Sequence, residues 1–330
     1  MCLSIFKYIL SGRLEMNNLI FSLNATMPVF LLMVFGYFLN RIGWMDDELA
    51  AKLNTFVFRI PLPVLLFHQL ATTNFIKAWD TKFVLFCFFA TFASILIVTL
   101  LSRALIKQRD LQGEFIQASY RSSAALLGIA YISNLYGRAT MAPLMIIGVV
   151  PLYNIMAVVV LSLTEPGQEK LNKAVLKKTI LGIFKNPIII GIVLGFLYSI
   201  LNLPMGKIPD KFLSEVAALS TPLGLMAMGA SVDVKKIGGQ LKNAIVASFI
   251  KLIALEIIFL PLAIKFGFRY DKLVAILIML GSATTVSSYV MCRNMHHEGI
   301  LTSNTVILTT ILSAFTLTFW IFLLRTLHTI

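Results

Sequence analysis

The stretch RSSAALLGIAYISNLYG, residues 121–137, lies where a membrane-spanning helix is expected, yet it is crowded with Gly, Ser and Asn. A second stretch of the same character, GSATTVSSYVMCRNMHHEG, occupies residues 281–299. Within a bilayer, polar or broken backbone is tolerated only where protein or a water-filled cavity satisfies its hydrogen bonds. We therefore expect these two stretches to form the working centre of a membrane protein.

The composition around these stretches excludes an ordinary soluble domain. Of the 330 residues 58% are hydrophobic and 13% are charged, and the mean hydropathy is +0.87. The net charge of +13 falls largely in short segments between apolar runs, where cations meet lipid headgroups, so we expect the lipid bilayer and no nucleic acid as a partner. Three scattered cysteines are too few for a disulfide framework or a thiolate metal site, and no cofactor or metal is expected.

The apolar segments predict an all-α polytopic membrane protein with ten transmembrane helices. About 20 helical residues cross a hydrocarbon core of about 30 Å, and most of the segments reach that length. Residues 1–23 form an N-terminal tail, of which residues 1–15, before the second methionine Met16, are interpreted as an extended or misassigned start. The ten segments are 24–44, 48–72, 80–105, 112–136, 141–164, 179–202, 210–232, 242–265, 272–294 and 300–325.

The Lys-rich interval in the middle of the chain divides the ten segments into five and five. We expect a first repeat at 24–165, a central cytoplasmic loop at 166–178, a second repeat at 179–325 and a C-terminal tail at 326–330. Because five is odd, the two repeats must cross the bilayer in opposite directions, as in many secondary transporters. Chance pairing of common residues is the alternative. The paired positions are Pro28 with Pro187, Gly36 with Gly195, Pro61-Leu62 with Pro222-Leu223, and Gly137 with Gly299.

Charged residues inside the apolar segments are costly unless they face a cavity or a partner. Arg121 either holds an anionic substrate or docks a broken helix, and the alternative is an arginine that extends to the membrane interface. Lys251 and Glu256 are five residues apart, which is poor spacing for an ion pair on an α-helix. We expect Lys251 to serve another helix or the substrate, with the two residues as candidates for an ion or charge relay.

Two further polar features need an interpretation. Asn154, in the fifth segment, is an amide that needs a partner, either the substrate or the backbone of a crossing helix. His296-His297-Glu298 has the residue types of a metal cluster but lacks the HExxH spacing. We therefore expect these three residues to form a solvated loop after the ninth segment.

The chain resembles the auxin efflux carrier family, the relatives of plant PIN carriers and bacterial malonate permeases. The resemblance is carried by NATMPVFLLMVFGYFLNRIGWM, RIPLPVLLF, YRSSAALLGIAYISNLYG, PLYNIMAVVV, KNPIIIGIVLGFL and KLIALEIIFLPLA. It implies ten helices in two inverted repeats, similar to the bile-acid sodium symporter fold, with the fourth and ninth helices broken and crossing. It places substrate binding at Arg121, Ser122, Ser123, Gly128, Asn154, Ala283, Thr284, Thr285 and Ser287.

The chain departs from many of these relatives where they have helix-breaking residues. Ser123 and Ala130 replace an Asn and a Pro, and the run GSATTVSS contains no Pro. Proline is an obvious cause of a helix break, so here the break must depend on Gly128, Gly281 and the hydroxyl groups. If both segments break, residues 123, 128, 283 and 284 should lie close together.

These features favour a secondary transporter that moves a small organic anion, a carboxylate, across the inner (cytoplasmic) membrane as an efflux carrier by alternating access. No acid pair, catalytic dyad or metal triad inside the segments indicates an enzyme. The alternative is a channel or membrane receptor without a transport cycle, which would need no internal repeat. The coupling ion, H⁺ or Na⁺, and the oligomeric state, including a homodimer, stay open.

Overall fold

The computed structural model describes residues 20, 23–24, 26–72, 79–124, 132, 135–136, 141–167, 181–232 and 234–330, without the side chains of 234–238. This part of the chain folds into helices and contains no strand. The helices are α2 (Asp47–Arg59), α3 (Pro61–Ala71), α4 (Thr81–Leu105), α5 (Arg109–Tyr120), α7 (Ala142–Leu163), α9 (Pro187–Ile200), α10 (Lys207–Ala218), α11 (Ser220–Ala230), α12 (Val234–Phe249), the π-helix η1 (Ile250–Ala254), α13 (Leu255–Lys265), α14 (Tyr270–Gly281), α15 (Val286–Asn294) and α16 (Ile300–Thr326).

Seven helical stretches in the described residues are long and apolar enough to cross a membrane, some of them formed by two consecutive helices. Two shorter apolar helices, Thr26–Arg41 and Pro187–Ile200, accompany them. The fourth expected segment, 112–136, is described only in part. The protein is therefore an all-helical, multi-pass membrane protein.

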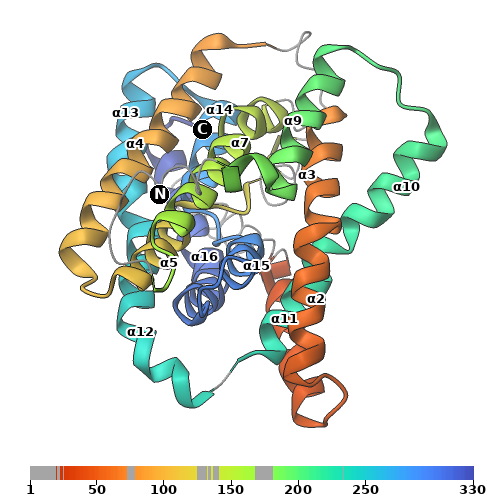
Figure 1. The fold of residues 1–330 in the computed structure, drawn as a ribbon. Helices are drawn as coiled ribbons and strands as arrows, with labels where there is room; N and C mark the ends of the chain where they lie inside the picture. The colour runs from red at the N-terminus through yellow and green to blue at the C-terminus, as the bar shows by residue number, and fades with distance from the viewer. Residues whose placement is uncertain are drawn as a thin grey trace.

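The helices form two groups (Figure 1). One group contains α2, α3, α9, α10 and α11, where α3 packs on α9 and α10, and α2 packs on α11. The other contains α4, α5, α7 and α12 to α16, with α4 against α7 and α12 against α16. Helix α15 contacts α2 and α11, so it lies at the seam between the two groups.

Glycines allow close helix contacts within the first group. A Cβ on Gly36 would strike the backbone of Met226 in α11, and a Cβ on Gly195 in α9 would lie 2.8 Å from the carbonyl oxygen of Phe67 in α3. Small residues at such contacts bring helix backbones together, which is the usual basis of helix association in membranes. Gly36 and Gly195 are one of the residue pairs on which the repeat prediction depends.

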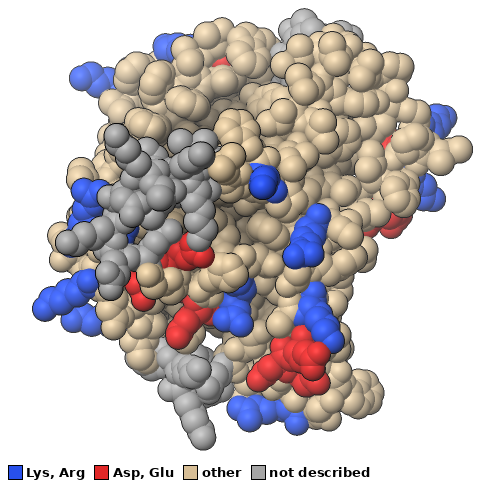
Figure 2. Space-filling model, viewed as in Figure 1, with Lys and Arg blue, Asp and Glu red and all other residues tan. Residues whose placement is uncertain are grey.

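The outer surface fits a lipid environment. Helix α4 exposes Phe89 and Leu100, and α9 exposes Val193 and Leu197, each about half or more accessible. On the face shown in Figure 2, most charged side chains lie at the margins and in the lower part, basic side chains also lie near the centre, and the upper right part is largely uncharged. Exposed apolar surface of this extent is expected where acyl chains replace water.

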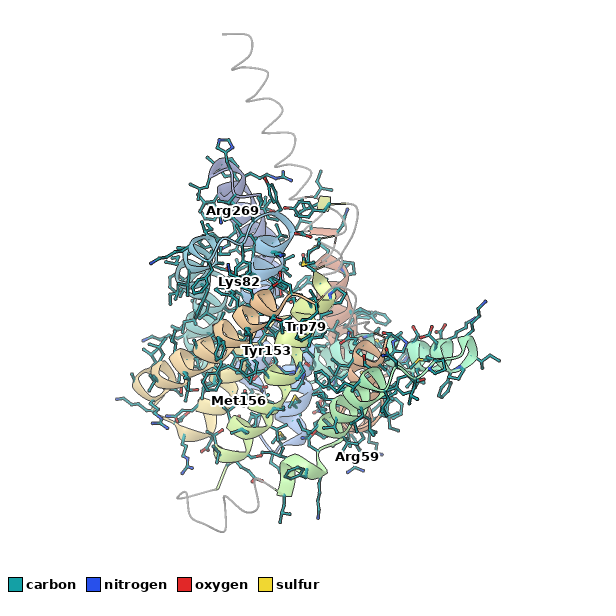
Figure 3. The ribbon with its side chains drawn as sticks, turned by 90° about the horizontal axis from the view of Figure 1, so that it is seen from above. Arg59, Trp79, Lys82, Tyr153, Met156 and Arg269 are labelled. Atoms are coloured by element: carbon teal, nitrogen blue, oxygen red, sulfur yellow. The ribbon has the colours of Figure 1, made fainter. Side chains whose placement is uncertain are left out.

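Polar contacts fix one end of the second helix group. The Asp80 carboxylate caps α4 by accepting the Phe83 N–H at 3.0 Å, and it also accepts a hydrogen bond from Lys272 Nζ at 2.5 Å. The hydrogen bond from Lys272 holds the pKa of Asp80 below its usual range. Lys82 Nζ donates to the Phe266 carbonyl at 2.7 Å, close to Arg269 in the view of Figure 3. In the same view Tyr153 lies in the interior and Arg59 at the edge.

Candidate functional site

Two non-helical stretches meet in the interior of the protein. Helix α5 ends at Tyr120, and its C-cap Arg121 is extended, with φ −75° and ψ 129°. Helix α14 ends at Gly281, and α15 begins only at Val286. The backbone N–H of Ser123 donates to the carbonyl oxygen of Ala283 at 2.9 Å. Residues 121–123 and 282–285 are therefore joined through their backbones, although about 160 residues separate them in the sequence.

Side chains satisfy the carbonyl groups that the end of α14 leaves free. The Met279 carbonyl accepts hydrogen bonds from Tyr153 Oη at 2.7 Å and from Ser122 Oγ. The Leu280 carbonyl accepts one from Lys251 Nζ. A helix end normally leaves up to four carbonyls unpaired, and inside a membrane each would be costly. The hydroxyl and ammonium donors therefore explain how this helix ends without a proline.

The other side of the break is satisfied in the same manner. The Thr284 N–H donates to Thr309 Oγ1 at 3.0 Å, and Thr284 Oγ1 donates to the Ala118 carbonyl at 2.8 Å. Gln117 Nε2 donates to the Ser288 carbonyl at 3.0 Å. Hydroxyl and amide side chains thus replace the missing helical hydrogen bonds, as the Ser/Thr-rich composition suggests.

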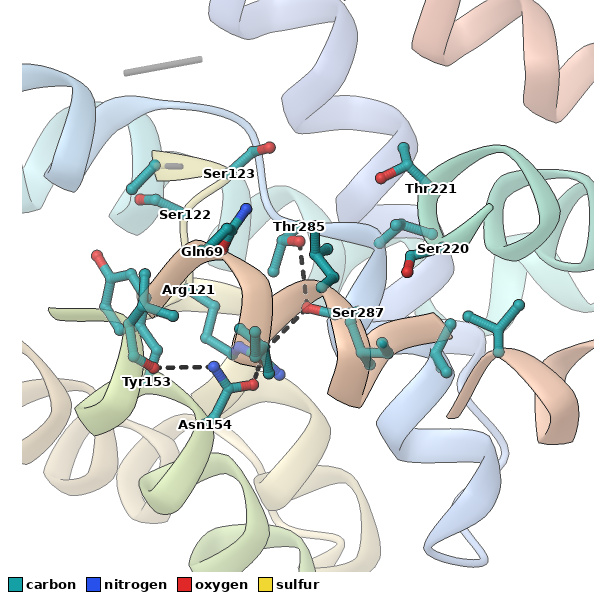
Figure 4. A pocket seen from close by; sticks show the side chains of 18 residues that line it. Gln69, Arg121, Ser122, Ser123, Tyr153, Asn154, Ser220, Thr221, Thr285 and Ser287 are labelled. Carbon is teal, nitrogen blue, oxygen red and sulfur yellow. Dashed lines mark hydrogen bonds between the residues drawn. The ribbon is translucent and has the colours of Figure 1, made fainter. Parts of the chain in front are cut away.

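A cavity of about 70 Å³ lies beside these stretches, between the two helix groups (Figure 4). Residues from α2, α3, α7, α11 and α15 surround it together with the stretch that follows α5. Its lining residues are Val57, Leu62, Leu65, Leu66, Gln69, Arg121, Ser122, Ser123, Ala124, Val150, Tyr153, Asn154, Ser220, Thr221, Thr285, Val286, Ser287 and Val290. A mostly apolar wall with a few convergent polar groups is typical of small-molecule sites.

Arg121 is the cation of this cavity, and its side chain is only 2% exposed. One terminal nitrogen donates to Asn154 Oδ1 and to Ser287 Oγ, both at 2.9 Å. The other lies 2.9 Å from Met291 Sδ and 3.4 Å from Gln117 Oε1, and Nε has no partner. No carboxylate of the described residues lies within ion-pair distance of this guanidinium. The positive charge is therefore held by neutral groups alone.

Two further buried charged residues lie beside the cavity but do not line it. Lys251 and Glu256 are both fully buried. Lys251 belongs to the π-helix η1. Among the described residues it forms no ion pair with Glu256, as their spacing predicts, and it contacts other elements instead. Lys251 Nζ donates to Ser122 Oγ at 2.5 Å, and the Glu256 carboxylate packs against Gly281.

The structure brings most of the sequence-predicted residues together. The residues of the set that line the cavity are Arg121, Ser122, Ser123, Asn154, Thr285 and Ser287. Ala283 and Thr284 instead hold the two non-helical stretches together, and Gly128 lies outside the described residues.

Three polar lining residues come from the first helix group and were missing from the sequence prediction. Gln69 lies on α3, and Ser220 and Thr221 lie at the start of α11. The sequence signal that could have identified them was the presence of polar residues inside the second and seventh apolar segments. Just after Ser220 and Thr221 on α11, Leu225 and Met228 lie in a buried apolar cluster.

The prediction of a solvated loop at residues 296–298 is wrong for His297. Its side chain is 2% exposed, and its ring nitrogens lie 3.0 Å from the carbonyl oxygens of Asp110 and Leu161. Nearby, the Glu114 carboxylate accepts the backbone N–H groups of Gly299 and Thr302 at the start of α16. This junction is a packed contact between α5, α7 and α16. Sequence periodicity could not reveal it, because all its partners are distant in the chain.

A second, polar cavity of about 450 Å³ lies farther along the same seam. Helix α15 contributes to both cavities, with Val290 in the first and Arg293 in the second. The second cavity is lined by Asn40, Arg41, Asp47, Ala230, Ser231, Val232, Tyr289, Arg293, Glu298, Gly299, Ile300, Ser303 and Asn304.

The fold and the site define a multi-pass helical membrane protein with a cation-containing cavity beside interrupted backbone. Comparison with family models agrees with this class. The chain belongs to the family described as membrane transport protein, the family of auxin efflux carriers and PIN-like transporters, whose model matches residues 21–321. No curated protein matches the chain. The protein is therefore a membrane transporter, consistent with a function other than catalysis.

Proposed function

We propose that the protein is a secondary transporter that carries a small organic anion, a carboxylate, out of the cell across the cytoplasmic (inner) membrane. The observation that carries this proposal is Arg121, a buried guanidinium that lines a cavity and has only neutral partners. An uncompensated buried cation is expensive, whereas an arginine fork matches a carboxylate with two parallel hydrogen bonds. An anionic substrate would supply the missing charge.

The surroundings of Arg121 support a small carboxylate. A cavity of about 70 Å³ has room for roughly two water molecules, given about 30 Å³ for each in the liquid. Ser287 and Thr285 lie at the N-terminus of α15, where unpaired N–H groups and the helix dipole favour an anion. Asn154 and Ser287 already contact Arg121 and would orient a carboxylate held between them.

The two helix groups support transport by alternating access. The cavities follow the seam between the groups, and relative movement there would open the substrate site to each side in turn. We propose ten helices in two inverted repeats, 24–165 and 179–325, joined by a cytoplasmic loop at 166–178. Gly36 on Met226 and Gly195 on Phe67 support this, because the contacts join the first helix to the seventh and the sixth to the second.

The proposal also assigns roles to the remaining candidate residues and names the partners. Ala283 and Thr284 hold together the two non-helical stretches that lie next to the cavity. Lys251 and Glu256 are the candidates for coupling to an ion, H⁺ or Na⁺. The lipid bilayer and the anion are the proposed partners, and a homodimer is compatible with the exposed apolar helices. The protein is proposed to act without a cofactor.

Uptake into proteoliposomes tests the proposal. A panel of mono- and dicarboxylates is offered with imposed proton or sodium gradients, and empty liposomes are the control. A carrier gives saturable uptake and counterflow, in which internal unlabelled anion accelerates the entry of labelled anion. Conductance without saturation or counterflow would favour the channel alternative, and binding without flux would favour a receptor.

A further inference from the structure

We propose that Glu256 is a proton-binding site, buried in the same helical stretch as Lys251, and that it couples proton movement to the movement of the anion. This inference rests on the proposed function, because it names the ion that moves with the anion through the same site. Three observations carry it: the unpaired Glu256 carboxylate, the location of Lys251 in a π-helix, and the Ser122 hydroxyl between Lys251 and the substrate cavity.

Glu256 has the surroundings of a group that binds and releases a proton. Its side chain is 0% exposed, and neither carboxylate oxygen has a hydrogen-bond partner in the described part of the chain. Its carboxylate packs against Gly281, where a Cβ would collide with Oε1. A buried ionised carboxylate without hydrogen bonds is far more costly than a carboxylic acid, and only a nearby cation offsets that cost.

Lys251 is that cation. From η1 its ammonium faces the Leu280 carbonyl of α14 and the Ser122 hydroxyl after α5. From α16 the contact with η1 is the neutral Trp320 Nε1, which donates to the Leu252 carbonyl at 3.0 Å. No ion pair joins Lys251 to Glu256 among the described residues, so the lysine acts on the acid through its charge and not through a contact. The pair gains one positive charge when Glu256 takes up a proton and loses it when the proton leaves.

Ser122 connects the proton site to the substrate site. Its Oγ accepts from Lys251 Nζ and donates to the Met279 carbonyl, while the residue lines the cavity next to Arg121. A change of charge at Glu256 therefore reaches the cavity through one hydroxyl group. π-helical turns are frequent at functional sites, and here the turn places the lysine at the interrupted helix.

The sign of the coupling follows from the charges. With Glu256 protonated, Arg121 and Lys251 present two positive charges to the cavity region; with Glu256 ionised, the net charge is one. The anion should therefore bind more tightly as the pH falls. By reciprocity the bound anion favours the protonated acid, so one proton leaves the cell with one monovalent anion without net charge, and the outward gradient of the anion drives both.

Infrared spectroscopy of the purified protein tests the proton site without any substrate. In wild-type protein labelled with ¹³C-glutamate, we expect an isotope-shifted band of a buried carboxylic acid that disappears as the pH is raised. Glu256→Gln should abolish this band, whereas Glu215→Gln, at an exposed position on α10, should leave it in place. A wild-type spectrum in which no buried glutamic acid titrates overturns the proposal, even if the variant fails to fold.

Anion binding then tests the coupling. Affinity for acetate and malonate is measured at mildly acidic and mildly alkaline pH, with choline in place of sodium. We expect several-fold tighter binding at acidic pH in wild type and in Glu215→Gln, and pH-independent, tight binding in Glu256→Gln. Equal pH dependence in Glu256→Gln and wild type, or pH-independent wild-type binding, overturns proton coupling. Absence of binding of any carboxylate at either pH, with a titrating Glu256 band, contradicts the proposed substrate class instead.

Discussion

Two cations lie in the interior of the described part of the chain, and their surroundings differ. Arg121 lines a cavity and is held by Asn154, Ser287 and Gln117, all of them neutral. Lys251 lines neither of the two cavities and lies five residues before the acidic Glu256, with a helix carbonyl and a serine hydroxyl as acceptors.

The difference shows two ways of offsetting the free-energy cost of a buried charge. A charge in a membrane interior must be compensated. For Lys251 the compensation is built into the fold, by Glu256 and by the carbonyl end of α14, where a cation is favourable. For Arg121 the fold supplies hydrogen-bond acceptors but no charge. The missing negative charge is what leads us to assign Arg121 to a ligand and Lys251 to the support of the helix break.

The largest expected effect is that of Arg121→Gln on transport. Hydrogen bonds to charged groups contribute about 1.5–3 kcal/mol, so losing the guanidinium should lower kcat/KM for the anion by roughly 10- to 100-fold. Arg121→Lys should be intermediate, because it keeps the charge but loses the planar fork. Initial uptake rates in proteoliposomes measure this, with Arg59→Gln, at an exposed position in α2, as the control. Unchanged kcat/KM in Arg121→Gln would make the two cations equivalent.

The substitution Gly281→Ala tests the packing around Lys251 and Glu256. The added Cβ would collide with the Glu256 carboxylate. Overpacking of this kind costs about 1–3 kcal/mol, so we expect a clearly lower thermal midpoint and a disturbed helix break. Gly239→Ala is the matched control, because a Cβ there meets nothing within 4 Å. Equal thermal midpoints for the two variants would show that the packing around Glu256 is loose.

His297→Gln tests a polar junction away from both cations. The glutamine carboxamide cannot place polar atoms at the positions of both ring nitrogens, so at least one contact to the two carbonyl oxygens is lost together with the packing of the ring, and stability should fall by roughly 1–2 kcal/mol. His296→Gln, in the neighbouring position, should have little effect. The measurement is thermal unfolding in detergent. If both histidine variants unfold together with wild type, the buried junction contributes nothing.

The smallest effect is expected at Asp80, on the surface of the second helix group. Its pKa is lowered by Lys272, so the stabilisation is present above the unfolded pKa of about 3.9 and is lost as the pH falls through the folded value. Asp80→Asn should lower stability at neutral pH by less than about 1 kcal/mol, as is usual for partly exposed pairs, and should equal wild type in acid. Thermal midpoints compared across pH decide this. A constant difference at all pH values would contradict an electrostatic origin.

The features that depend on local composition could be predicted from the sequence. Apolar length predicted the helices, and the Ser/Thr-rich run after Gly281 predicted a break without proline, because hydroxyls can satisfy freed backbone groups. Arg121 stood out as a charge in an apolar segment.

Features that depend on a change of helical register or on distant partners could not be predicted. The π-helical turn that contains Lys251 is a change of helical register, which an argument from 3.6 residues per turn does not anticipate. His297 becomes buried through carbonyls more than a hundred residues away. Gln69, Ser220 and Thr221 reach the cavity only because the first helix group packs against the second.

Equilibrium binding tests the central claim most directly, namely that Arg121 holds an anion in this cavity. The measurement is saturation binding to the purified protein of the radiolabelled carboxylate that shows counterflow. We predict saturable binding of one anion per chain in wild type, weakened by roughly 10-fold or more in Arg121→Gln. Folding of the variant is confirmed by an unchanged thermal midpoint without anion. Equal affinity of the folded variant and wild type would contradict the assignment of Arg121 to the substrate.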